Sequence, residues 1–103
     1  MYLDKYSKEI DSLCSQNKVK SLYVFGSVLT DRFSETSDIN LLVDIYSNDP
    51  LEYAESYFNL KFALQNLLGR PVDLLENKAI KNPYIQENID RSRILIYGRQ
   101  LTI

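Results

Sequence analysis

The segment from Asp38 to Ile45 constrains the fold of this chain more than any other. Its residues alternate between apolar and mostly polar side chains, as in a strand whose successive residues point to opposite faces. One face is fully apolar and carries Ile39, Leu41, Val43 and Ile45. The opposite face carries Asp38, Asn40, Leu42 and Asp44. The pattern therefore predicts a strand that covers a core with one face and presents polar groups on the other.

The rest of the chain alternates between helical and strand patterns. Helices are predicted over residues 3–16, 50–68 and 83–91, a short helix over 27–33, and further strands over 19–25, 71–75 and 93–97. In the long helix we expect Ala54, Tyr57, Phe58, Leu64 and Leu68 to face the core. This order is typical of an α/β (α+β) fold, in which helices flank a sheet. The link from Gly26 to Asp38 is too short for a helical crossover, which predicts an antiparallel first pair and a small mixed β-sheet in a single domain, residues 1–103.

The composition excludes several kinds of chemistry. The chain has 103 residues, a net charge of −2, no histidine and one cysteine, Cys14. Ser-His-Asp catalysis, Cys-His catalysis and His-ligated metal sites are therefore excluded. A chain without internal disulfides fits the reducing cytoplasm, which is the expected location. The negative balance argues against binding to nucleic acid or to a membrane surface, and no apolar run is long enough to span a bilayer.

Gly26 and Ser27 end the first predicted strand. Glycine lets a backbone approach a ligand closely, and a serine hydroxyl with nearby amides can donate to phosphate oxygens. Taken alone, most Gly-Ser pairs are simply turns.

Asp38 and Asn40 lie two residues apart, which places both side chains on one face of a strand. Asp73, on a later strand, is a third oxygen ligand that could complete a site. Hard cations such as Mg²⁺ prefer such ligands and often bind together with substrate phosphates. Alone, Asp38 would be read as part of a turn that enters a strand.

The combined spacing of the Gly-Ser pair and the three candidate ligands is more specific than any of these features alone. Gly26-Ser27, ten residues, Asp38-Ile39-Asn40 and the later Val72-Asp73-Leu74 resemble the nucleotidyltransferase superfamily, whose signature is G-S-x10-D-x-D plus a third carboxylate. Lys81-Asn82-Pro83-Tyr84 and the last strand extend the similarity to the minimal nucleotidyltransferase (MNT) branch. The resemblance covers roughly residues 19–98 and implies a polymerase-β-like nucleotidyltransferase core.

The resemblance also implies an activity. Gly26 and Ser27 would bind the triphosphate of ATP, with Arg32 as the best basic candidate beside them. Asp38, Asn40 and Asp73 would act as the catalytic residues and hold two Mg²⁺ ions. The family transfers AMP from ATP to a hydroxyl, and its stand-alone members are commonly antitoxins of HEPN-type toxins. Such an antitoxin silences the toxin by adding AMP to a tyrosine, by binding to it, or by both.

Asn40 departs from the family pattern, which has aspartate there. An amide oxygen ligates as a neutral group, so the donor set falls from three carboxylates to two. The chain can be a natural member kept for binding, an inactivated variant, or an enzyme in which the nucleotide's phosphates supply the missing charge. The substitution predicts a site that is impaired as written.

Other residues leave further alternatives open. Arg70 and Lys81 either neutralise phosphate or are solvated surface charges. Eight tyrosines, with Tyr53 and Tyr57 on the long helix, indicate either a protein partner or self-association, or half-buried rings. The competing functions are AMP transfer to a HEPN-like toxin and catalytically weak neutralisation of that partner by binding. A nucleotidyltransferase for small molecules or RNA is less consistent, because such relatives usually carry an extra domain for the acceptor.

Overall fold

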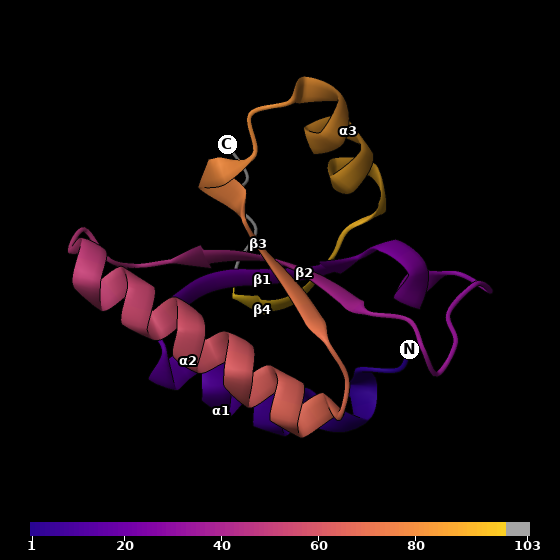
Figure 1. The fold of residues 1–103 in the computed structure, drawn as a ribbon, viewed down its shortest axis with the longest axis horizontal. Helices are drawn as coiled ribbons and strands as arrows, with labels where there is room; N and C mark the ends of the chain where they lie inside the picture. The colour runs from indigo at the N-terminus through magenta and orange to yellow at the C-terminus, as the bar shows by residue number, and fades with distance from the viewer. Residues whose placement is uncertain (99–103) are drawn as a thin grey trace.

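The computed structural model describes residues 1–98, and its elements follow the predicted order (Figure 1). They are α1 (Ser7–Gln16), β1 (Val19–Phe25), β2 (Ile39–Ile45), α2 (Pro50–Leu68), β3 (Val72–Glu76), α3 (Pro83–Ser92) and β4 (Ile94–Gly98). Three short 3-10 turns are η1 (Asp4–Tyr6), η2 (Gly26–Leu29) and η3 (Asn77–Ala79). The helix expected over 27–33 is therefore only the turn η2. None of the helices in residues 1–98 combines the length and apolarity that crossing a membrane requires.

The four strands form one mixed sheet in the order β3-β2-β1-β4. β1 pairs antiparallel with both β2 and β4, whereas β2 and β3 are parallel. The predicted antiparallel first pair and the mixed sheet are both confirmed. The helix α2 provides the long connection that a parallel pair needs, and it thereby brings β3 alongside β2.

The sheet separates two layers of helices (Figure 1). α1 and α2 cover one face, and α3 lies over the other. The first face holds the main core, which includes Ile39 and Leu41 of β2, as the alternation predicts. The second face holds a smaller cluster in which Leu42 packs with Tyr23 and with Ile89 of α3. Asn40 precedes Leu42 by two residues, so its side chain belongs to the α3 face of the sheet.

The helix α2 begins and ends as its sequence predicts. The Asp49 carboxylate accepts a hydrogen bond from the backbone N–H of Leu51 at 3.0 Å, and Gly69 ends the helix in a left-handed conformation. Its predicted core face is partly wrong, because Ala54 is exposed and Phe58 is 49% exposed. The buried stripe consists of Ser56, Leu60, Leu64 and Leu68. Apolar residues occur on several sides of this helix, so periodicity alone did not determine which side faces the core.

Candidate functional site

Asn40 lies near the start of β2, at the end of the sheet where the sequence predicts the site. In the strand register it pairs with Phe25 of β1 on one side and with Asp73 of β3 on the other. Partner residues on neighbouring strands have Cα atoms about 5 Å apart. The parallel pairing of β2 and β3 therefore makes Asn40 and Asp73 direct neighbours, and both lie on the α3 face.

Asp38 comes immediately before β2 and is exposed. The backbone N–H of the next residue, Ile39, donates to the carbonyl oxygen of Pro71 at 3.1 Å. Two residues along an extended chain span about 7 Å, so Asp38 lies one strand repeat from Asn40. Asp73 is also exposed, whereas Asn40 is half-buried.

The turn at Gly26 and Ser27 closes directly against Asn40. Gly26 has a φ of +83°, and a Cβ atom at this position would lie 2.5 Å from Nδ2 of Asn40. Only glycine combines this left-handed backbone with so close an approach. Within the described residues the hydroxyl of Ser27 makes no hydrogen bond, while its carbonyl oxygen accepts from the N–H of Thr30 at 2.9 Å. The hydroxyl is thus available to a ligand at this turn.

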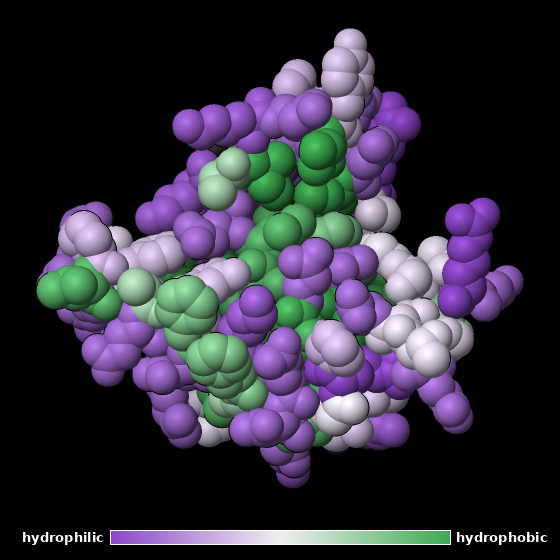
Figure 2. Space-filling view, in the orientation of Figure 1, coloured by the Kyte–Doolittle hydropathy of each residue, from purple (hydrophilic) through white to green (hydrophobic). Residues whose placement is uncertain are grey.

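A cleft of about 300 Å³ adjoins this turn on the α3 face of the sheet. Apolar side chains gather on the surface between α3 and the sheet (Figure 2). The cleft is lined by Phe25, Gly26, Leu75, Ile85, Asn88, Ile89 and Ser92. Sequence reasoning missed the α3 members, although their spacing over 85–92 is that of one helix face. The cleft offers an apolar wall that reaches the turn at Gly26, and Gly26 in turn contacts Asn40.

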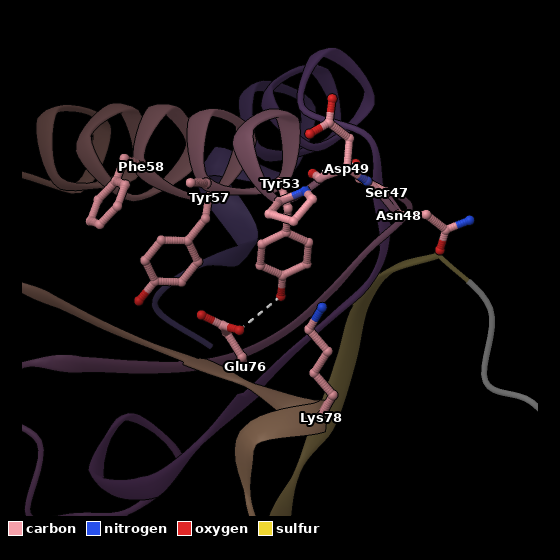
Figure 3. Close-up of a pocket in the computed structure, with 10 residues that line it drawn as sticks. Ser47, Asn48, Asp49, Tyr53, Tyr57, Phe58, Glu76 and Lys78 are labelled. Atoms are coloured by element: carbon pink, nitrogen blue, oxygen red, sulfur yellow. Dashed lines mark hydrogen bonds between the residues drawn. The ribbon is translucent and has the colours of Figure 1, made fainter.

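A separate cavity of about 330 Å³ lies where β2 and β3 end, and none of the predicted phosphate and cation ligands lines it. Figure 3 shows its polar groups bound to one another: the Tyr53 hydroxyl donates to Oε2 of Glu76 at 3.1 Å. Nζ of Lys78 lies 3.7 Å from the centroid of the Tyr53 ring. The hydroxyl of Tyr57 donates to the carbonyl oxygen of Leu74 at 2.6 Å. These tyrosines are therefore half-buried with engaged hydroxyls, whereas the exposed aromatic residues of α2 are Phe58 and Phe62.

The comparisons with known proteins decide the family. The sequence matches the polymerase beta nucleotidyltransferase family over residues 8–102. The chain belongs to this family. A relative is MJ0128, a candidate protein adenylyltransferase of Methanocaldococcus jannaschii, which is 42% identical over 77% of this chain and 78% of that protein. The predicted polymerase-β-like core is confirmed.

Two solved structures share the fold of this nucleotidyltransferase. A candidate minimal nucleotidyltransferase is 32% identical, with a TM-score of 0.73, over 89% of this chain and 90% of the other. A complex of a tri-AMPylated Shewanella oneidensis HEPN toxin with an MNT antitoxin contains a chain that is 20% identical, with a TM-score of 0.65, over 96% of this chain and 74% of that chain.

The donor set of this nucleotidyltransferase fits Mg²⁺ in its chemistry. The carboxylates of Asp38 and Asp73 and the amide oxygen of Asn40 are hard oxygen ligands. The missing Cβ at Gly26 lets the Asn40 amide lie directly against the turn. Within residues 1–98 no three Asp, Glu, His or Cys side chains gather as a metal group. Because Asn40 is neutral, the set has one negative charge fewer than the G-S-x10-D-x-D pattern with its third carboxylate.

The basic residues weighed in the sequence have different surroundings. Arg32 is exposed in the loop between η2 and β2, where its backbone N–H donates to Oγ1 of Thr30 at 3.2 Å. Lys81 is exposed as well. Arg70 is half-buried and binds the backbone of the loop before β2, so it is not a solvated surface charge. Arg32 and Lys81 remain open to solvent and to a ligand.

Substituting Gly26 tests the close approach to Asn40. We expect Gly26→Ala to lower the free energy of unfolding by about 1–2 kcal/mol through its left-handed backbone. It should also weaken nucleotide binding, because the new methyl group displaces the Asn40 amide. Gly69→Ala is the matched control, since Gly69 has a φ of +67° and no atom within 4 Å of an added Cβ. Urea denaturation and titration with an ATP analogue measure both effects; equal loss of nucleotide binding in the two variants would contradict the expectation.

The tyrosines of the separate cavity predict how stability depends on pH. Burial, and then the hydrogen bond to Glu76, raise the pKa of Tyr53 above the ordinary value of a tyrosine. Burial likewise raises the pKa of Tyr57. The folded state thus favours the neutral phenols, and the stability that they contribute is complete below pH 10 and is lost as the pH rises further.

We therefore expect Tyr53→Phe to reduce the drop in the free energy of unfolding between about pH 8 and about pH 11, as measured by urea denaturation. Tyr46, which is 62% exposed, provides the control variant Tyr46→Phe. An unchanged pH dependence in Tyr53→Phe would contradict the assignment.

Proposed function

We propose that this nucleotidyltransferase transfers AMP from ATP to a hydroxyl group of a partner protein, with Mg²⁺ as cofactor. The observation that carries the proposal is the register of the sheet, which makes Asn40 and Asp73 neighbours directly beside the Gly26-Ser27 turn. Nucleotide phosphates would lie against Ser27 and Arg32, and the cleft under α3 would take the apolar part of the nucleotide.

In this reaction the acceptor oxygen forms a bond to the α-phosphorus while the bond from that phosphorus to the bridging oxygen of the β-phosphate breaks. Pyrophosphate leaves with the electron pair, and the hydroxyl proton passes to water. When bound, Mg²⁺ supplies positive charge that stabilises the developing charge on these oxygens. Asp38, Asn40 and Asp73 would hold this ion at the end of the sheet where the side chains of Asp38 and Asp73 are exposed to an approaching acceptor.

The acceptor that we propose is a tyrosine of a HEPN-type toxin, so that the chain acts as an antitoxin. The relatives support this choice: one carries the name of a protein adenylyltransferase, and one related complex pairs an AMPylated HEPN toxin with an MNT antitoxin. The cytoplasm, where ATP is abundant, is the location that we propose.

Asn40 favours a second candidate function. With two carboxylates instead of three, the site holds cations less well, and the chain would neutralise the same partner by binding without transfer. Radiolabelled ATP, Mg²⁺ and a HEPN-type toxin separate the two functions. Label on a toxin tyrosine supports transfer, whereas toxin neutralisation without ATP and without label supports binding. A chain that binds neither nucleotide nor toxin contradicts both.

A further inference from the structure

Arg70 connects three parts of the chain next to the candidate site. Its Nη1 atom donates hydrogen bonds to the carbonyl oxygens of Ser34 and Ser37, both at 3.0 Å. Its guanidinium carbon lies 4.7 Å from the ring centroid of Tyr2 and 4.6 Å from that of Phe33. A guanidinium that binds two carbonyls and lies against two aromatic rings has a defined position. The segment before β3 is thereby joined to the N-terminal turn and to the loop before β2.

Hydrogen bonds hold the backbone immediately before and immediately after Asp38. The carbonyl of Ser37, in the peptide group before Asp38, accepts from Arg70. The N–H of Ile39, in the peptide group after Asp38, donates to the carbonyl oxygen of Pro71. Both peptide groups that flank Asp38 are thus bound to residues 70 and 71, three and two positions before Asp73. This arrangement determines where Asp38 lies relative to Asp73.

The loop has few other contacts that could do the same. Ser37 donates its N–H to the carbonyl oxygen of Ser34 at 3.1 Å, and the Ser37 hydroxyl accepts from the N–H of Ser34 at 3.0 Å. These bonds close the turn upon itself but do not attach it to the sheet. Exposed turns with only local hydrogen bonds open easily. Phe33, next to this turn, packs against the main core. Within residues 1–98, Arg70 is the side chain that joins the carbonyls of the turn itself to the segment before β3 by hydrogen bonds.

We propose that Arg70 is a positioning residue, which holds the Asp38 carboxylate at the distance from Asp73 that shared cation binding requires. This inference rests on the proposed function. Arg70 acts through the backbone of the 34–38 turn and does not contact the nucleotide. Residues that orient metal ligands change metal affinity about 10–100-fold when they are replaced, and the small donor set of this site leaves little to compensate for a displaced Asp38.

The test compares Arg70→Met with the parent chain, both in the Asn40→Asp background. Methionine keeps an apolar stem against the rings and removes the hydrogen-bond donors. Electron paramagnetic resonance measures the Kd for Mn²⁺ in the presence of a non-hydrolysable ATP analogue, and hydrogen exchange measures the opening of the Ile39 amide. Arg91→Met is the matched control, because Arg91 is 73% exposed and, among residues 1–98, its ion pair is with Glu87 on α3. Arg70→Lys is a second variant that keeps the charge.

We expect Arg70→Met to raise the Kd for Mn²⁺ about tenfold, together with faster exchange at Ile39, while Arg91→Met changes neither. Arg70→Lys should change both quantities in the same direction and by less. Faster exchange at Ile39 with an unchanged Kd would reduce Arg70 to a purely structural role and overturn the proposal. A raised Kd with unchanged exchange would also overturn it, because Arg70 would then act directly on the nucleotide or metal. Absence of Mn²⁺ binding in the parent that retains Arg70 would instead contradict the proposed function itself.

Discussion

Asn40→Asp should raise the rate of AMP transfer roughly 100-fold or more. The substitution replaces the amide nitrogen by an oxygen and adds a full negative charge. This charge lies on the residue that pairs with Asp73 in the sheet. A charged group aimed at the reacting centre is worth about 3 kcal/mol in the transition state, and each 1.36 kcal/mol corresponds to about tenfold in rate. Single-turnover transfer of label from α-labelled ATP to a HEPN-type toxin measures the effect.

Asp44→Asn is the matched control for charge on this strand. Asp44 is on the same face of β2 as Asn40 but near the opposite end of the strand, about 13 Å away by the rise of an extended chain. We expect Asp44→Asn to leave the rate within about twofold, as surface substitutions outside a site generally do. Equal rates for the parent and Asn40→Asp would mean that position 40 does not act on the nucleotide.

Asp73→Asn should abolish most of the transfer that Asn40→Asp provides. In the Asn40→Asp background it returns the site to two carboxylates, so the rate should fall again by roughly 100-fold or more. Because Asp73 is exposed, its replacement should change the free energy of unfolding by only about 0.5 kcal/mol. The same single-turnover assay, with urea denaturation in parallel, separates lost chemistry from lost folding. Full activity in the double variant would show that Asp73, and with it β3, does not contribute to the site.

The alternation over 38–45 predicted the faces of β2 correctly, because in a strand the side-chain period of two alone determines which residues share a face. The short link from Gly26 to Asp38 likewise predicted the antiparallel pair, since a parallel pair requires a long crossover. Both inferences depend on local geometry, which the order of residues contains directly.

The pairing of Asn40 with Asp73 was harder to predict. It depends on how α2 returns the chain to the sheet, and the inner face of α2 was itself partly mispredicted at Ala54 and Phe58. Asp73 was predicted as a site residue from the resemblance to a nucleotidyltransferase, and its place in the sheet was not predicted.

The role of Arg70 could not be found from the sequence. Its carbonyl partners, Ser34 and Ser37, precede it by 36 and 33 residues, and backbone carbonyls carry no residue-specific signal. An arginine before a strand was equally consistent with phosphate binding or with exposure to solvent. The α3 residues that line the cleft were missed for a related reason, because their helix was expected but the face of the sheet that it covers was not.

Paramagnetic broadening by Mn²⁺ tests most directly whether residues 38, 40 and 73 form one cation site beside Gly26. The measurement is a two-dimensional NMR spectrum of the Asn40→Asp chain with an ATP analogue, before and after addition of substoichiometric Mn²⁺. We predict selective loss of the amide signals of residues 26–28, 38–40 and 73, with those of Tyr53 and Glu76 retained. Broadening centred on Tyr53 and Glu76, or none that depends on the nucleotide, would contradict the account.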